Sequence, residues 1–123
     1  MSEKVKSYRD LIVWQKATEL VMAVYRLTSK FPNAELYGLV SQMRRCAVSI
    51  PSNIAEGRTR GSRKDFRQFL ITAISSGAEL ETQLVISSEL RLGKKEDYGK
   101  VEILLDEIMR MLNKMIDTLS NQL

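Results

Sequence analysis

Arginine and lysine are the side chains whose type and spacing in this sequence suggest a chemical role. Between residues 44 and 67 the net charge is +5, whereas the rest of the chain carries −1. Arg63 and Arg67 are four residues apart and adjoin Lys64, so on a helix the three would form one cationic ridge. Helix N-termini also attract phosphate through their free amides. The sequence therefore predicts a nucleic-acid site at Arg58, Arg60, Arg63, Lys64 and Arg67, which Arg44 and Arg45 could extend.

The same cluster is also compatible with an ordinary solvated face whose arginines form salt bridges. Glu56 and Asp65 are the acids within the segment. Its aromatic residues, Phe66 and Phe69, fall on the apolar period of the expected helix and are assigned to the core. Base stacking is therefore not expected at the cluster, and binding there would be electrostatic, without readout of base sequence.

Catalytic chemistry has little support in the sequence. The chain contains no histidine, which removes the commonest general base and zinc ligand, and it has one cysteine, Cys46. Gly57 and Gly61 are not followed by the Lys-Ser/Thr of a phosphate-binding loop. We therefore expect no enzyme, no metal site and no cofactor. A buried, unpaired thiol and the absence of a signal peptide or membrane segment predict a cytoplasmic protein.

Apolar residues recur at three- and four-residue spacing along four segments, which predicts helices over residues 8–29, 35–56, 63–91 and 95–119. Pro51 is expected to kink the second helix, and the segment from Gly57 to Gly61 is expected to form a turn. Ser62 is a candidate N-cap and Gly93 a candidate terminator. Because the connections are short, the prediction is all-α: an up-down-up-down antiparallel four-helix bundle in one domain, residues 1–123.

The first predicted helix is apolar around nearly its whole circumference, which favours a contact with another molecule and predicts a homo-oligomer. Central burial within the monomer would explain the same composition. Ile103 and Met109 lie off the main stripe of the last helix and could join that surface. The small residues Ser75, Ser76, Gly77 and Ala78 indicate close packing in the third helix.

Three ordered motifs carry a resemblance to a known family: Tyr8-Arg9-Asp10-Leu11 with Val13-Trp14-Gln15-Lys16-Ala17, then Ser49-Ile50-Pro51-Ser52-Asn53-Ile54-Ala55-Glu56-Gly57, and Ala78-Glu79-Leu80-Glu81-Thr82-Gln83-Leu84. The chain resembles small four-helix bundle proteins first met as products of 23S rRNA intervening sequences. Through them it is similar to the accessory variability determinant of diversity-generating retroelements. The resemblance implies a homopentameric barrel with a basic surface and, in the retroelement relative, association with nucleic acid and a reverse transcriptase.

Together these observations predict a non-enzymatic homo-oligomer that binds structured RNA or DNA through its basic segment. The alternative is a protein-interaction scaffold, in which the apolar surplus recruits another protein and the arginines keep the assembly soluble. Cys46 stands where an alanine would be more typical of the family, a difference that alters neither expectation.

Overall fold

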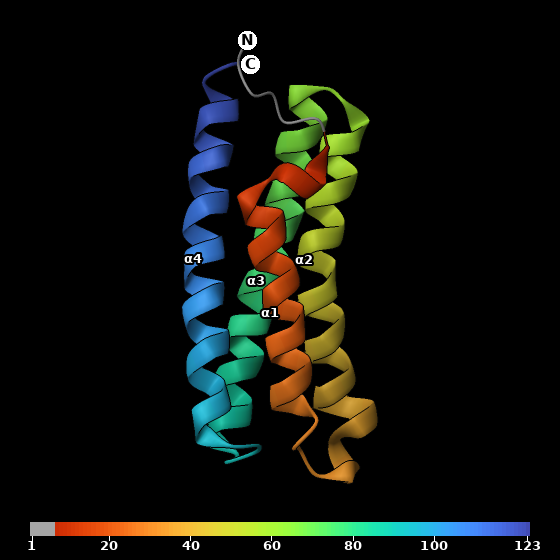
Figure 1. Ribbon diagram of the computed structural model, residues 1–123, viewed down its shortest axis with the longest axis vertical. Coiled ribbons are helices and arrows are strands. Elements are labelled where there is room, and N and C mark those ends of the chain that lie inside the picture. The colour runs from red at the N-terminus through yellow and green to blue at the C-terminus, as the bar shows by residue number, and fades with distance from the viewer. Residues whose placement is uncertain (1–6) are drawn as a thin grey trace.

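The computed structural model describes residues 7–123 and contains four α-helices: α1 (Ile12–Thr28), α2 (Ser41–Arg60), α3 (Arg63–Glu89) and α4 (Lys95–Ser120). No strand occurs within the described residues. The chain direction alternates from each helix to the next (Figure 1). α1 packs against α2 and α4, and α3 packs against the same two helices. The all-α four-helix fold is thus as predicted; residues 1–6 of the predicted domain lie outside the described part.

The first helix begins at Ile12, so the predicted start at residue 8 is wrong. Tyr8–Asp10 instead form a short 3-10 turn. The Arg9 amide donates to Ser7 Oγ at 3.1 Å, and the Ser7 amide donates to an Asp10 carboxylate oxygen at 3.3 Å. This capping box closes the turn, and Leu11 then adopts an extended backbone (φ −74°, ψ 125°) before α1 starts.

The connection from α1 to α2 contains a π-helical segment, Leu36–Val40, which follows a 3-10 turn over Asn33–Glu35. Gly38 departs from helical dihedral angles (φ −114°, ψ −108°). By contrast, α2 continues as one helix through Pro51, although proline has no N–H to donate. The kink at Pro51 stays a prediction, and the observed irregularity of this region lies at Gly38.

Gly57 belongs to α2 and is not part of a turn, which corrects both the turn predicted to start there and the helix end predicted at residue 56. Gly57 is buried, and a Cβ built on it would lie 2.6 Å from Phe69 Cβ of α3. The helix needs a residue without a side chain there because α3 passes so close. α2 ends after Arg60, where Gly61 adopts the left-handed conformation (φ 92°).

The ends of α3 are set by local hydrogen bonds. Ser62 is the N-cap, as predicted, and its hydroxyl oxygen accepts from the Asp65 amide at 3.0 Å. At the other end Arg91 takes the left-handed conformation (φ 58°). The amides of Arg91 and Leu92 donate to the carbonyls of Ser88 and Ser87, a Schellman motif. Gly93 also has positive φ (74°), but the helix has already ended at Glu89.

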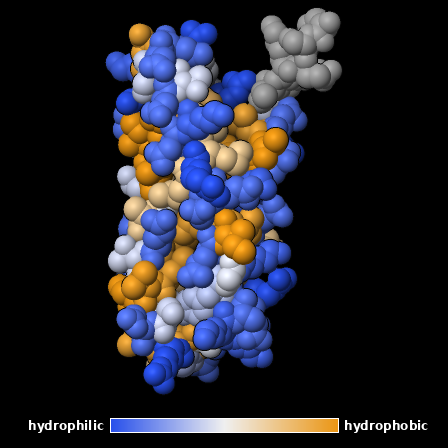
Figure 2. Space-filling view, turned by 90° about the vertical axis from the view of Figure 1, so that its left-hand side faces the viewer, coloured by the Kyte–Doolittle hydropathy of each residue, from blue (hydrophilic) through white to orange (hydrophobic). Residues whose placement is uncertain are grey.

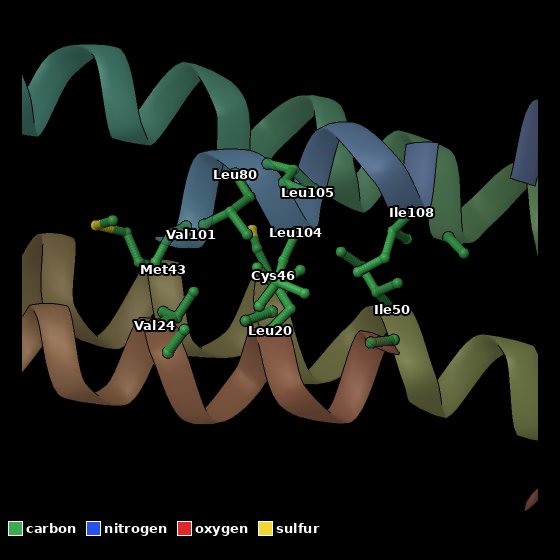
Figure 3. Packing of buried hydrophobic residues seen from close by; sticks show 14 of the residues in the cluster. Leu20, Val24, Met43, Cys46, Ile50, Leu80, Val101, Leu104, Leu105 and Ile108 are labelled. Carbon is green, nitrogen blue, oxygen red and sulfur yellow. The ribbon is translucent and has the colours of Figure 1, made fainter. Parts of the chain in front are cut away.

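Each helix contributes one buried stripe to a single core. Figure 3 shows labelled residues from all four helices meeting along the bundle axis, including Leu20, Ile50, Leu80 and Ile108. Gly77 lets Met109 of α4 approach α3, and Met109 is therefore half-buried rather than part of an outer surface. Ile103, by contrast, is 71% exposed, as its position off the stripe predicted.

Alanine substitutions at two helical glycines should have opposite effects on stability. Gly57→Ala gains about 1 kcal/mol of helix propensity but must displace Phe69 from a tightly packed junction, an overpacking cost of about 1 to 3 kcal/mol. We expect net destabilisation of about 1 kcal/mol, measured by urea unfolding. Gly99→Ala is the matched control: a Cβ there meets nothing within 4 Å, so this variant should be stabilised by about 0.5 to 1 kcal/mol. A stabilised Gly57→Ala variant would contradict the packing explanation.

Candidate nucleic-acid interface

The five predicted site residues lie together at the turn between α2 and α3; they are called the basic patch below. Arg58 and Arg60 are in the last turn of α2, and Arg63, Lys64 and Arg67 are in the first two turns of α3. Gly61 and Ser62 alone separate the two helices. The tight junction holds both groups at the same end of the bundle, where α4 also ends (Figure 1).

The contacts of the basic patch differ from residue to residue. Arg60 forms a salt bridge with Glu56 at 2.9 Å, and its guanidinium lies 5.1 Å from the centroid of the Phe69 ring. Arg67 Nε donates to Ser120 Oγ at 2.7 Å, which ties α3 to the end of α4. Arg63 and Lys64 are exposed to solvent, and Arg58 is half-buried.

The electrostatic balance of the patch is positive. Glu56 and Asp65 are the acidic residues between residues 44 and 67. Asp65 lies in the first turn of α3, where a carboxylate interacts favourably with the helix dipole. Both side chains of the Arg60–Glu56 salt bridge are about half exposed, so the interaction stabilises the position of Arg60 by less than about 1 kcal/mol. A phosphate can therefore compete with Glu56 for the Arg60 guanidinium. Arg63 and Lys64 are exposed and accessible to a phosphate.

Arg44 and Arg45 do not extend the patch, which corrects that prediction. Arg44 precedes Arg58 by fourteen residues of continuous helix, so about 20 Å separates them along the axis of α2. Arg44 is also engaged with α1: its Nε donates to Thr28 Oγ1 at 2.9 Å, and its guanidinium lies 4.3 Å from the Tyr25 ring centroid.

A polar seam lies between α2 and α3 and was not predicted from the sequence. Ser49 and Ser76 share a hydrogen bond of 2.8 Å, and Asn53 Nδ2 donates to Ser49 Oγ at 2.9 Å. Gln83 is buried, and its Oε1 has no hydrogen-bond partner. The i, i+4 spacing of Ser49 and Asn53 in the second motif was the available signal. Ser49 and Asn53 of the second motif thus contribute to the packing of α2 against α3.

Cys46 lies buried in this seam, and burial raises the pKa of its thiol above the ordinary value, with Glu79 adding to the rise and a hydrogen bond from Gln83 opposing it. At pH 8 the folded protein therefore holds less thiolate than the unfolded chain. We expect Ellman's reagent to react with native Cys46 at least about a hundredfold more slowly than with the urea-unfolded chain. Native and unfolded rates of similar size would contradict this.

Within residues 7–123, no three histidine, cysteine, aspartate or glutamate side chains lie close enough together to hold a metal ion. The described chain does place the five cationic side chains of the basic patch at one end of the bundle.

Comparison with curated proteins finds no match. A family model described as "23S rRNA-intervening sequence protein" matches residues 9–114. This range includes the second and third motifs, all of the first motif except Tyr8, and the whole basic patch. By that match the chain belongs to the 23S rRNA-intervening sequence protein family.

Proposed function

We propose that this protein is a non-enzymatic homo-oligomer that binds structured RNA or DNA electrostatically through the basic patch. The observation that carries the proposal is the gathering of five cationic side chains on one tight helix junction. Exposed Arg63 and Lys64 occupy the first turn of α3, where the helix dipole adds to their charge. Phosphate groups of a helical nucleic acid match such a site, because they present a regular row of negative charge.

The absence of a free aromatic ring in the patch favours backbone contacts over base contacts. Phe66 and Phe69 are half-buried, and the Arg60 guanidinium lies over the Phe69 ring. Binding of an RNA or DNA duplex does not require an aromatic ring, because the bases of a duplex are already stacked on one another. The patch should therefore bind duplexes and hairpins with little preference for sequence.

Salt dependence tests this function directly. If about five phosphates are neutralised, a plot of log affinity against log salt should have a slope of roughly −4 to −5 for a duplex. Fluorescence anisotropy with duplexes of two unrelated sequences would measure it. A slope near zero, or a strong preference for one sequence, would contradict electrostatic binding.

The self-association that we propose uses a different surface from the one that the sequence predicted. Most of the apolar residues of α1 are buried against α2 and α4, so the predicted surplus shrinks to Ile12, Met22 and Tyr25. α3 also exposes aliphatic side chains, namely Val85 and Ile86. By length and composition α3 is the one helix of the described chain that could cross a membrane, and 39% of its most apolar window is buried. Core helices of soluble proteins meet the same criterion, so this is weak evidence for a membrane.

The α3 outer face, as we name it, consists of half-buried or exposed residues that recur at helical spacing: Ile71, Ser75, Ala78, Thr82, Val85 and Ile86. Its hydroxyl groups are satisfied within the helix, because Ser75 donates to the Ile71 carbonyl and Thr82 to the Ala78 carbonyl. Val85 is 63% exposed. Figure 2 faces α4, where hydrophobic residues reach the surface between polar ones. A second copy of the chain can cover these uncharged side chains, while the exposed Glu79 and Glu81 of α3 lie beside them.

Native mass measurement with and without nuclease counts the subunits and detects bound nucleic acid in one preparation. An oligomer that releases nucleic acid on nuclease treatment is the expected result; five subunits is the number that the resemblance implies. A single 14.1 kDa species without nucleic acid would overturn the proposal. One stoichiometric protein partner, unaffected by nuclease, would favour the scaffold alternative. Association with a reverse transcriptase stays a prediction from the distant resemblance.

A further inference from the structure

An open groove between the end of α1 and the start of α2 combines aromatic, cationic and aliphatic side chains. It has a volume of about 480 Å³, and its walls include Tyr25, Leu36, Tyr37, Arg44, Arg45 and Val48. None of the residues that line it is acidic. The groove lies at the opposite end of α2 from the basic patch and shares no residue with it.

Tyr37 is the most exposed large side chain of the groove. Its side chain is 93% exposed, so the ring has almost no support from the rest of the chain. Tyr37 lies in the segment Leu36–Val40, next to Gly38, where the backbone departs from helical geometry (φ −114°, ψ −108°). An aromatic ring held out in this way offers a face on which another planar group can stack.

Arg44 supplies a second planar group, the guanidinium, and contacts within the chain already fix its position. The guanidinium lies 4.3 Å from the Tyr25 ring centroid, and the side chain is held by Thr28 Oγ1 at 2.9 Å and by the Tyr25 carbonyl at 3.5 Å. The neighbouring Arg45 is exposed. The groove thus presents an ordered arginine on a tyrosine, a free tyrosine and a free arginine.

We propose that this groove binds an unpaired segment of RNA or DNA, with a base stacked on Tyr37 and backbone phosphates held by Arg45 and Arg44. Aromatic rings beside cations are how proteins hold single strands, because each base has a free face once it leaves the duplex. A polyanion complements two arginines in a groove without a carboxylate. Duplex nucleic acid offers no free base face to Tyr37, so this ligand class differs from that of the basic patch.

Binding of labelled single strands to the full-length protein at low salt tests the assignment. The probes are oligothymidylate, oligouridylate, an abasic strand of the same length and a duplex of the same length. Tyr37→Ala should weaken binding of both base-bearing strands by about tenfold, and Tyr37→Trp should restore it. Neither change should alter binding of the abasic strand or of the duplex. Arg45→Ala should lower the salt slope for single strands by about 0.7.

Matched controls separate stacking from general damage to the surface. Met22→Ala removes another exposed side chain from α1 (69% exposed), outside the groove lining, and should leave binding of all four probes unaffected. Unchanged binding of oligothymidylate and oligouridylate by Tyr37→Ala would overturn the proposal. An equal loss for the abasic strand would do the same, since it would reduce the site to charge alone. Loss of self-association by Tyr37→Ala with unaltered strand affinity would reassign the groove to a contact with a second copy.

Discussion

Replacing Arg63, Lys64 and Arg67 together with glutamate is expected to weaken duplex binding by about three-thousandfold at about 50 mM salt. With a slope near −0.9 per neutralised phosphate, each lost contact lowers the association constant by about 15-fold at that salt concentration. Arg63 and Lys64 are exposed, and Arg67 loses one hydrogen bond to Ser120, so the fold should tolerate the change. Anisotropy titration of a labelled duplex would measure the loss.

The control for this triple variant carries the same change of net charge at the other end of the bundle. Lys94, Lys95 and Lys100 are exposed near the start of α4, and their replacement by glutamate should reduce duplex affinity by less than about tenfold, through the overall field alone. Equal losses in the two triple variants would mean that net charge, and not the basic patch, governs binding. An unchanged affinity in the first variant would remove the patch from the proposed function.

The parts of this fold that sequence could predict are those that depend on neighbours along the chain. The four apolar periods located the helices, and the Ser62 cap was recognised because its partner, Asp65, is three residues away. Features that depend on another helix were missed. Gly57 looked like a turn residue because nothing in its own segment indicates that Phe69 of α3 presses against it. The early break at Leu11 was also missed, because the apolar spacing predicted one helix that begins at residue 8.

The candidate sites also divide into those formed by neighbours along the chain, which could be predicted, and those formed between helices, which could not. The basic patch could be predicted because its five residues flank one short turn, so sequence proximity became spatial proximity. Arg44 and Arg45 were misplaced because their charge was counted without the length of helix between them and Arg58. The groove beside Tyr37 and the polar seam around Ser49 and Ser76 each join two helices, and composition alone pairs no residues across helices.

Ala78→Arg is expected to dissociate the proposed oligomer, because it places a charge in the centre of the α3 outer face. Ala78 is exposed in the monomer, so the arginine can reach water there without disturbing the core. In an assembled interface the same charge would be buried without a partner, at a cost of several kcal/mol, which lowers the association constant by at least about a hundredfold. Sedimentation at micromolar concentration should then show a species near 14.1 kDa.

Asn113→Arg provides the comparison, since Asn113 is equally exposed but lies on α4, where Asp106 and Arg110 form a salt bridge one turn away and charges already face water. This variant should assemble like the unaltered chain. If Ala78→Arg leaves the assembly intact while Asn113→Arg disrupts it, the contact between copies runs along α4 instead. Avidity links the result to function, because a monomer presents one basic patch, whereas an oligomer presents one per subunit. A long duplex can contact several patches of the oligomer at once, but a short duplex contacts one. Dissociation by Ala78→Arg should therefore weaken binding of long duplexes more than binding of short duplexes.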